Sequence, residues 1–299
     1  MKKTLLTICL VWMCFSLSAQ KIIDLSGKWS FSIDRQDNGE KEKWFSHTLN
    51  DFINLPGSMP EKLKGDEVTA KTQWTGSLYD SSYYYNPYME KYRKEGNIKF
   101  PFFLTPDKHY VGAAWYQKEV NIPADWKGER ILLFLERPHI ETTVWVNGQK
   151  TGMQNSLCVP HQYDITRYVR PGKCTITIRV DNRIKEINVG PDSHSITDQT
   201  QGNWNGIVGR ICLQTTPKTY FDDIQIYPEP EQKLARVKVV IKGTGTAKVK
   251  LSAESFNTDK KHIVPAIQQE IKLNKGVTET EMVLPMGNDM LLWLSLIHI

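Results

Sequence analysis

The chain has few cysteines, and their arrangement argues against two common kinds of site. Five occur among 299 residues, and Cys9 and Cys14 fall close to the N-terminus. The three that remain, Cys158, Cys174 and Cys212, are widely spaced. Their odd number and spacing predict neither a complete disulfide framework nor a metal knuckle or CxxC redox pair. We expect all three to be small, buried apolar side chains.

The chain also has little net charge. The 38 basic and 33 acidic residues leave a net charge of +5, and Lys2 and Lys3 supply two of those positive charges. So small an excess gives no reason to expect a nucleic acid or an anionic membrane as partner. A glycine-rich phosphate loop after a strand and a GxSxG elbow are missing as well, which argues against the chemistry that those motifs carry. No feature of the sequence indicates an oligomeric state.

The N-terminus carries an apolar run, Leu5 to Leu17, which follows two lysines and leads into the small residues Ser18 and Ala19. This pattern is typical of a secretory signal peptide over residues 1–19, with cleavage near Ala19. A membrane anchor would need roughly 20 apolar residues to cross the hydrocarbon layer, so we expect no membrane span. The sequence therefore predicts an exported protein, periplasmic or extracellular.

Beyond the leader, apolar residues recur with a period of two, and no window longer than a few turns keeps a helical period. This alternation is typical of half-buried antiparallel strands. Asn147-Gly148 predicts a type I′ hairpin turn, because both residues tolerate a positive φ. We expect an all-β protein whose sheets pack face to face with jelly-roll or Greek-key connections. The clearest strand faces are Trp29/Phe31/Ile33, Ile176/Ile178/Val180 and Val237/Val239/Ile241.

The composition predicts two domains. A jelly-roll, galactose-binding-domain-like sandwich is expected over 20–218, and the polar run Pro228-Glu-Pro-Glu231 has the composition of a linker. An immunoglobulin-like sandwich is expected over 219–293, with Gly243-Thr-Gly-Thr246 as its first turn. This second domain is shorter than the roughly 100 residues of a complete immunoglobulin-type sandwich, so we expect it to be incomplete. We interpret 294–299 as an artefactual tail. The strands of the second domain are expected at 237–242, 247–253, 267–273 and 277–284.

A long insertion from 55 to 111 interrupts the first domain. Loops of this length in compact domains are usually functional. Aromatic rings stack on the C–H faces of sugars, so the insertion could form a carbohydrate platform. Equally, its tyrosines could pack the insertion against its own sheet. The aromatic residues concerned are Trp74, Tyr79, Tyr83, Tyr84, Tyr85, Tyr88 and Tyr92.

A series of short motifs, taken in order and spacing, resembles the N-terminal half of glycoside hydrolase family 2, the β-galactosidase, β-glucuronidase and β-mannosidase group. The resemblance runs from about Leu25 to Trp293. The motifs that carry it are Leu25-Ser-Gly-Lys-Trp-Ser-Phe31, Leu55-Pro-Gly-Ser58, Trp115-Tyr-Gln-Lys-Glu-Val120, Val144-Trp-Val-Asn-Gly148, Tyr163-Asp-Ile-Thr166 with Pro171-Gly172, Arg179-Val-Asp-Asn182 and Gly206-Ile-Val-Gly-Arg210.

The resemblance implies a jelly-roll sugar-binding domain, an immunoglobulin-like domain and then a (β/α)₈ barrel that holds the chemistry. Retaining glycosidases use two carboxylates about 5 Å apart, and in this family both come from the barrel. No catalytic residue is therefore assigned in this chain, and Glu136, Glu141 and Asp192 are expected to be structural or solvated. The resemblance implies no cofactor in the chain itself.

One stretch, His194 to Arg210, could reach the active site from the first domain. Asp198 precedes Trp204 much as an acidic residue does in the β-galactosidase branch, where that residue contacts the terminal sugar and a bound cation. The resemblance thus implies substrate contact and metal ligation for Asp198 in the full-length enzyme, with a monovalent or divalent cation. Gln199, Asn203, Trp204 and His194 are candidate substrate neighbours. The alternative for Asp198 is an Asx-turn or a strand-end cap.

Two functional hypotheses remain. The first is the N-terminal fragment of an exported retaining β-glycosidase, β-galactosidase-like, that acts on a terminal β-linked sugar of an oligo- or polysaccharide and is inactive without its barrel. The second is a stand-alone, lectin-like carbohydrate-binding module. A binding module should end in a closed sheet, because an unpaired edge invites aggregation.

Overall fold

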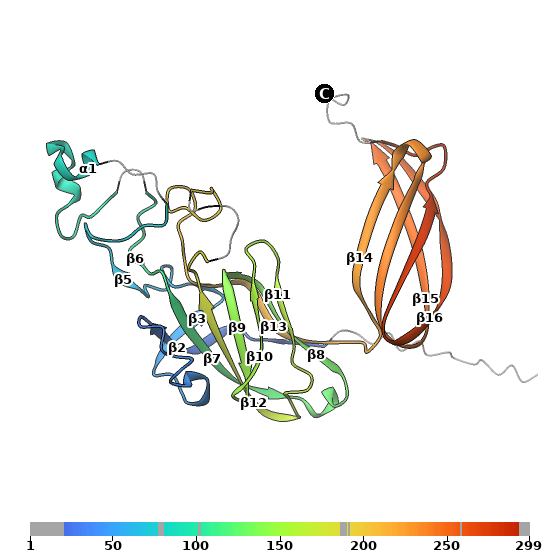
Figure 1. Ribbon diagram of the computed structural model, residues 1–299, viewed down its shortest axis with the longest axis horizontal. Helices are drawn as coiled ribbons and strands as arrows, with labels where there is room; N and C mark the ends of the chain where they lie inside the picture. Colours follow the sequence, from blue (N-terminus) through green and yellow to red (C-terminus); the bar gives the residue numbers. More distant parts are fainter. Residues whose placement is uncertain are drawn as a thin grey trace, which may run out of the picture. The chain divides into compact units, whose positions relative to one another are not determined.

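The computed structural model describes residues 21–76, 81–100, 103–185, 190, 192–257 and 259–292. The expected leader (1–19) and tail (294–299) lie outside these residues, as does Tyr79. The chain divides into two compact units, one ending at Thr216 and one beginning at Pro217. The regular secondary structure of both units is almost wholly β, as expected (Figure 1). No helix among the described residues is both long and apolar enough to cross a membrane.

The first unit is a sandwich of two antiparallel sheets. One sheet has the order β1-β13-β8-β11, with β4 paired to β13, and the other has the order β10-β9-β12-β7-β2-β3. Figure 1 shows these strands in blue, green and yellow. Their bounds are β1 Ile22–Asp24, β2 Gly27–Asp34, β3 Asp51–Leu55, β4 Gly57–Ser58, β7 Ala113–Ile122, β8 Arg130–His139, β9 Glu141–Val146, β10 Gln149–Asn155, β11 His161–Asp164, β12 Gly172–Asp181 and β13 Gly206–Thr216.

The core of this unit lies between the two sheets and is filled by the residues that the alternation predicts. Trp29 and Phe31 of β2 are buried there, and Ile33 packs against them. Ile176, Ile178 and Val180 of β12 are fully buried in the same cluster. The predicted turn at Asn147-Gly148 is confirmed, since it joins β9 to β10 and both residues have a positive φ. The strand pattern of this unit was therefore readable from the sequence.

The insertion carries the remaining short elements of the first unit. Asp66–Glu67 (β5) pairs with Lys108–His109 (β6), which brings the two ends of the insertion together. Between them lie the one-turn helix α1, Ser82–Tyr85, and the 3-10 helix η2, Pro87–Tyr92. Two further 3-10 helices, η1 (Trp44–Ser46) and η3 (Ala124–Trp126), lie outside the insertion.

The second unit differs from its expected strand pattern. Its three-stranded sheet consists of β14 (Tyr220–Glu229), β15 (Leu234–Asn257) and β16 (Lys260–Pro285). The expected turn at 243–246 is wrong, because it lies within β15, where the register shifts between Gly243 and Gly245. Glycines allow such a bulge, so each long strand bends without ending and replaces two expected strands. The residues expected to form a linker instead join β14 to β15 through the 3-10 helix η4, Pro230–Gln232.

The cysteines also depart in part from expectation. Cys174 and Cys212 are buried, as predicted, but Cys158 is exposed. It lies between β10 and β11, outside the alternating strand pattern that identifies the core positions. All three are free thiols.

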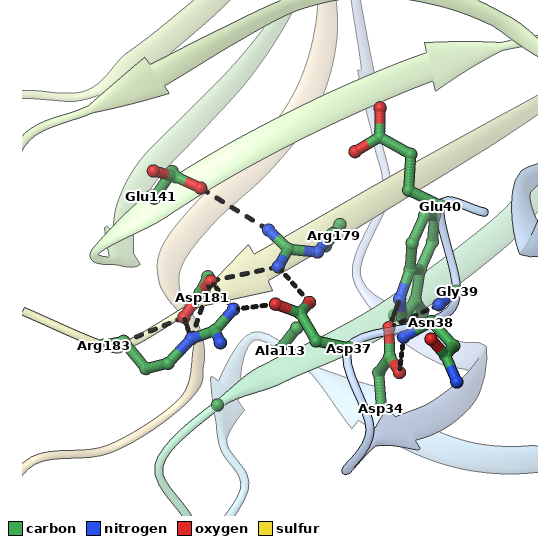
Figure 2. Close-up of polar contacts among 12 residues, drawn as sticks. Asp34, Asp37, Asn38, Gly39, Glu40, Ala113, Glu141, Arg179, Asp181 and Arg183 are labelled. Carbon is green, nitrogen blue, oxygen red and sulfur yellow. Dashed lines mark hydrogen bonds and ion pairs between the residues drawn. The ribbon is translucent and has the colours of Figure 1, made fainter. Parts of the chain in front are cut away.

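A network of charged side chains covers the end of β12 (Figure 2). Arg179 donates hydrogen bonds to Asp181 (3.0 Å) and to Asp37 (2.6 Å), and Arg183 bridges the same two carboxylates. Asp181 is fully buried. Although burial raises its pKa, the hydrogen bonds from Arg183 and Lys185 outweigh this effect, so the pKa lies well below its ordinary value. Asp181 is therefore ionised and holds three basic side chains.

A second buried carboxylate, Asp34, shapes the loop that carries Asp37. It accepts hydrogen bonds from the backbone N–H groups of Asn38 and Gly39 and from the indole of Trp115, each at 2.9 Å (Figure 2). A Cβ atom at Gly39 would lie 2.5 Å from the indole nitrogen, so only glycine fits there. The loop is thereby fixed where Asp37 can reach Arg179.

We predict that Asp181→Ala lowers the free energy of unfolding by about 3–5 kcal/mol, because it removes the fully buried carboxylate that Arg179, Arg183 and Lys185 share. Urea unfolding of the chain checks this value. The matched control is Glu119→Ala, which breaks the exposed pair with Lys173 on the neighbouring strands. It should cost about 0.5 kcal/mol or less. Equal losses for the two variants would contradict the role given to Asp181.

Candidate functional site

The expected site residue Asp198 lies in the segment between β12 and β13 and is 1% exposed. Its Oδ2 accepts the backbone N–H of Thr75 (2.6 Å), and its Oδ1 accepts that of Asn203 (2.5 Å). His109 Nε2 lies 3.4 Å from Oδ2. The Asp198 backbone also pairs with Thr75 and with Leu104. This carboxylate therefore ties the insertion to the segment before β13.

Three asparagines organise the same region. The Asn203 amide donates to Thr75 Oγ1 (3.0 Å) and to the carbonyl of Asn182 (3.1 Å). Asn182 in turn bonds the backbone of Gly112 and Tyr110. Asn205 bonds the Tyr116 hydroxyl, the carbonyl of Gly112 and that of Val180, and all three asparagines are buried. The end of β12 and the start of β13 are thus joined by side-chain amides.

Next to these residues the surface is hollowed by a cavity of about 390 Å³. One wall comes from the segment before β13 and includes Asp198, Asn203 and Trp204. Another comes from the insertion, at 104–106, and a third from Ser58 and Pro60. We call this cavity the Asp198 hollow. It combines an aromatic side chain, apolar groups and a few polar groups, which is the composition expected of a small-molecule site.

A close backbone contact places the Ser58 wall. Gly206 pairs with Ser58 where β13 begins, and its φ is +145°. A Cβ atom at this position would lie 2.5 Å from the carbonyl oxygen of Gly57, so any other residue would force the two strands apart. This close contact explains why the sequence has a glycine soon after the site residues Asn203 and Trp204.

His139, at the end of β8, packs against Trp204. The two rings stack with centroids 4.6 Å apart. Burial lowers the pKa of His139 from its ordinary 6.5 to about 4, and the nearby Asn203 amide and Asp198 charge oppose this shift only in part. The imidazole is therefore neutral near pH 7. Neither His139 Nε2 nor Asn203 Oδ1 has a hydrogen-bond partner within the described ranges, although both atoms are buried.

The structure thus brings together three of the five expected site residues: Asp198, Asn203 and Trp204. Gln199 is half-buried and His194 is exposed; neither lies among the described residues that line the Asp198 hollow. The substrate role of all five stays a prediction. Sequence reasoning missed Asn182, although it belongs to the motif Arg179-Val-Asp-Asn182.

The other histidines and carboxylates have mainly structural partners. His161 bonds Thr142 and Ser156, whereas His139 Nε2 is unpaired within the described ranges. Glu136 accepts from Arg210, and Glu141 pairs with Arg179 and Lys185.

The cation implied for Asp198 can be tested against its surroundings. Both carboxylate oxygens already accept backbone N–H groups, and within the described part of the chain no group of three or more His, Cys, Asp or Glu side chains is arranged to hold a metal. Hard cations need several oxygen ligands. The residues present therefore do not fit a cation by themselves.

The aromatic residues of the insertion divide into two groups. Trp74 packs on Phe100, Phe103 and His109, and Tyr83 stacks on Phe100, so these side chains form a small core. By contrast, Tyr84 is 44% exposed, Tyr85 72% and Tyr88 85%. The packing interpretation holds for the first group, and the second faces solvent.

Comparison with known proteins places this region in a family. Residues 22–217 match the model for the sugar binding domain of glycosyl hydrolases family 2. Human β-glucuronidase is 24% identical over 266 residues, which cover 80% of this chain and 35% of the human protein. That of Paenibacillus borealis is 25% identical over 222 residues, or 69% of this chain and 31% of that protein. The chain spans about a third of the length of these relatives.

Solved structures agree on the fold. The β-glucuronidase of an uncultured Clostridium species has a TM-score of 0.53 at 19% identity, covering 91% of this chain and 40% of that one. The Ruminococcus gnavus β-glucuronidase, in complex with D-glucaro-d-lactam, has a TM-score of 0.55 at 17% identity, covering 90% and 40%.

We predict that His139 makes the stability of the chain sensitive to acid. Because its pKa is lower in the folded chain, the unfolded chain binds the extra proton between the unfolded and folded pKa values, and stability falls as the pH drops through that window. From about pH 7 to about pH 4.5, the wild type should lose about 2–3 kcal/mol more than His139→Gln. Urea unfolding at both pH values measures the difference.

The control is His194→Gln, which removes an exposed histidine from the same region. It should keep the wild-type pH dependence. If His139→Gln and the wild type lose stability in parallel, the neutral state of His139 contributes nothing to folding.

Proposed function

Because the chain belongs to glycosyl hydrolases family 2, we propose that it is the non-catalytic front of an exported retaining β-glycosidase. The observation that carries this proposal is the match of 22–217 to the sugar binding domain of that family. The relatives continue well beyond the matched length, which leaves room for a catalytic barrel after these two units. In such an enzyme the two reacting carboxylates would come from the barrel, and this chain would contribute to the substrate pocket.

Within this proposal, the Asp198 hollow receives the terminal sugar. Trp204 offers a ring for an apolar sugar face, and the Asp198 carboxylate, although only 1% exposed, lies in the wall of the hollow where a hydroxyl group can approach it. Because two backbone N–H groups already bind Asp198, its position is set before a ligand arrives. A carboxylate held in this way can add a charge-assisted hydrogen bond without losing its own conformational freedom on binding.

Two sugars are candidates for the terminal position. The arrangement of Asp198 before Trp204 favours a β-galactoside, because the sequence resembles the β-galactosidase branch at that point. The relatives named above are β-glucuronidases, which favours a β-glucuronide.

Export rests on the leader at 1–19, whose lysines and apolar run precede a small-residue cleavage site.

The first test is catalytic. The purified chain, residues 20–299, should hydrolyse neither an aryl β-galactoside nor an aryl β-glucuronide, because no acid–nucleophile pair is assigned in it. Turnover above a buffer blank that Asp198→Asn abolishes would overturn the proposal.

The second test uses a full-length protein that contains this chain and the barrel. Asp198→Asn should lower kcat/KM for the better substrate by an amount equivalent to about 1–3 kcal/mol, the scale of a hydrogen bond to a charged group. Thermal unfolding of the same variant shows whether the fold survives. An unchanged kcat/KM with an intact fold would remove Asp198 from the substrate site.

The alternative, a lectin-like binding module, is favoured by one observation: the hollow is formed wholly by described residues of the first unit. It predicts micromolar binding of a single sugar by this chain alone. Calorimetric titration with galactose, mannose and glucuronate decides between the two functions, since the enzyme proposal expects no such affinity without the barrel.

A further inference from the structure

A second hollow, larger than the Asp198 hollow, is a cleft of about 1030 Å³ in the insertion. The described residues that line it are 67–70, Arg93, 95–100 and 103–107. We call it the insertion cleft. Its volume is at the upper end of the roughly 300–1,000 Å³ that small-molecule sites occupy. It therefore has room for several sugar units.

The walls of the cleft are apolar and aromatic in part. They include Val68, Ala70, Ile98, Phe100 and Phe103. Phe100 and Phe103 are held by Trp74, on which Phe103 stacks at 5.3 Å between centroids. Their orientation is thus set by packing within the insertion. Phe100 is only 3% exposed, so it supports the wall from within, and the half-buried Phe103 is the ring that can meet the C–H face of a sugar at little entropic cost.

The charges around the cleft almost balance. Arg93 and Lys99 are positive, and Glu67, Glu95 and Asp107 are negative. Glu67 is also neutralised by Lys108 across the β5–β6 pair. A polyanion needs a clear excess of positive charge, which these walls do not supply. The cleft therefore favours neutral, hydroxyl-rich units.

The insertion cleft and the Asp198 hollow adjoin one another. Leu104, Thr105 and Pro106 line both. The backbone N–H of Leu104 also donates to the carbonyl of Asp198, which fixes this shared wall against the segment before β13. A ligand longer than one sugar could therefore pass from the hollow over residues 104–106 into the cleft.

We propose that the insertion cleft is an accessory glycan-binding site, which holds the neutral inner units of a β-linked oligosaccharide whose terminal unit lies in the Asp198 hollow. The placement of the terminal unit in the Asp198 hollow rests on the proposed function, whereas the binding of inner units in the insertion cleft does not. The site is formed by the walls of the cleft, and the exposed Tyr85 and Tyr88 take no part. The insertion then selects for chain length, and the hollow selects for the terminal sugar.

Calorimetric titration of the chain with galactose and with β-1,4-galactotetraose tests the proposal. The tetrasaccharide should bind at least about tenfold more tightly than the monosaccharide, a gain of about 1.4 kcal/mol. Two variants fill the cleft from different lining segments, Ala70→Trp and Ile98→Trp, and each should remove the gain. Tyr88→Ala, on the outer face, is the matched control and should keep it. Thermal unfolding confirms that each variant is folded.

A gain that survives both cleft-filling variants, or one that Tyr88→Ala removes, would overturn the proposal. So would equal binding of the monosaccharide and the tetrasaccharide by the wild type. A hyaluronan tetrasaccharide that binds more tightly than galactotetraose would overturn the preference for neutral units. If Asp198→Asn leaves the binding of galactose itself unchanged while the cleft-filling variants abolish the gain, the accessory site stands and the role of Asp198 in the proposed function fails.

Discussion

The part of the first unit that carries the candidate site depends on the ion pairs of one buried, ionised carboxylate, that of Asp181. It ends β12 with a charge that must be compensated, and Arg179, Arg183 and Lys185 supply the compensation. The basic side chains then reach Asp37 and Glu141, so that loops distant in sequence meet at one point. Once the backbone is held there, the next residue, Asn182, is in place to bond both the end of the insertion and Asn203.

The polar groups of the Asp198 hollow also hold distant segments of the chain together. Most of them bind backbone amides or carbonyls, so they act first as connectors between segments and only second as surface for a ligand. Three buried side-chain atoms lack a partner within the described ranges, and two of them, His139 Nε2 and Asn203 Oδ1, belong to residues beside Trp204; the third is Trp74 Nε1. Burial without a partner is costly, and such atoms cluster where a structure gives up stability for another purpose.

Much of the fold could be predicted from the sequence, because alternation of apolar residues reports directly on which face of a strand is buried. This held for Trp29 and Phe31 and for the turn at Asn147-Gly148. It failed at Gly243, because a glycine that bends a long strand and a glycine that ends one look alike in sequence. The Asp198 hollow was only partly predictable: Asp198, Asn203 and Trp204 are neighbours in the chain, whereas Thr75, His139 and Leu104 come to them through tertiary packing that no spacing reveals.

Asp198 also constrains how chains of this kind can diverge. The Asp198 carboxylate accepts the backbone N–H groups of Thr75 and Asn203, so replacing it loosens two distant segments. A substitution at this position therefore has to preserve folding before it can change ligand binding. Leu104, which touches the same hollow, contributes a backbone bond that any residue except proline can make. Evolutionary change in ligand preference should therefore collect in the inserted loop, where side chains can vary at little cost to the scaffold.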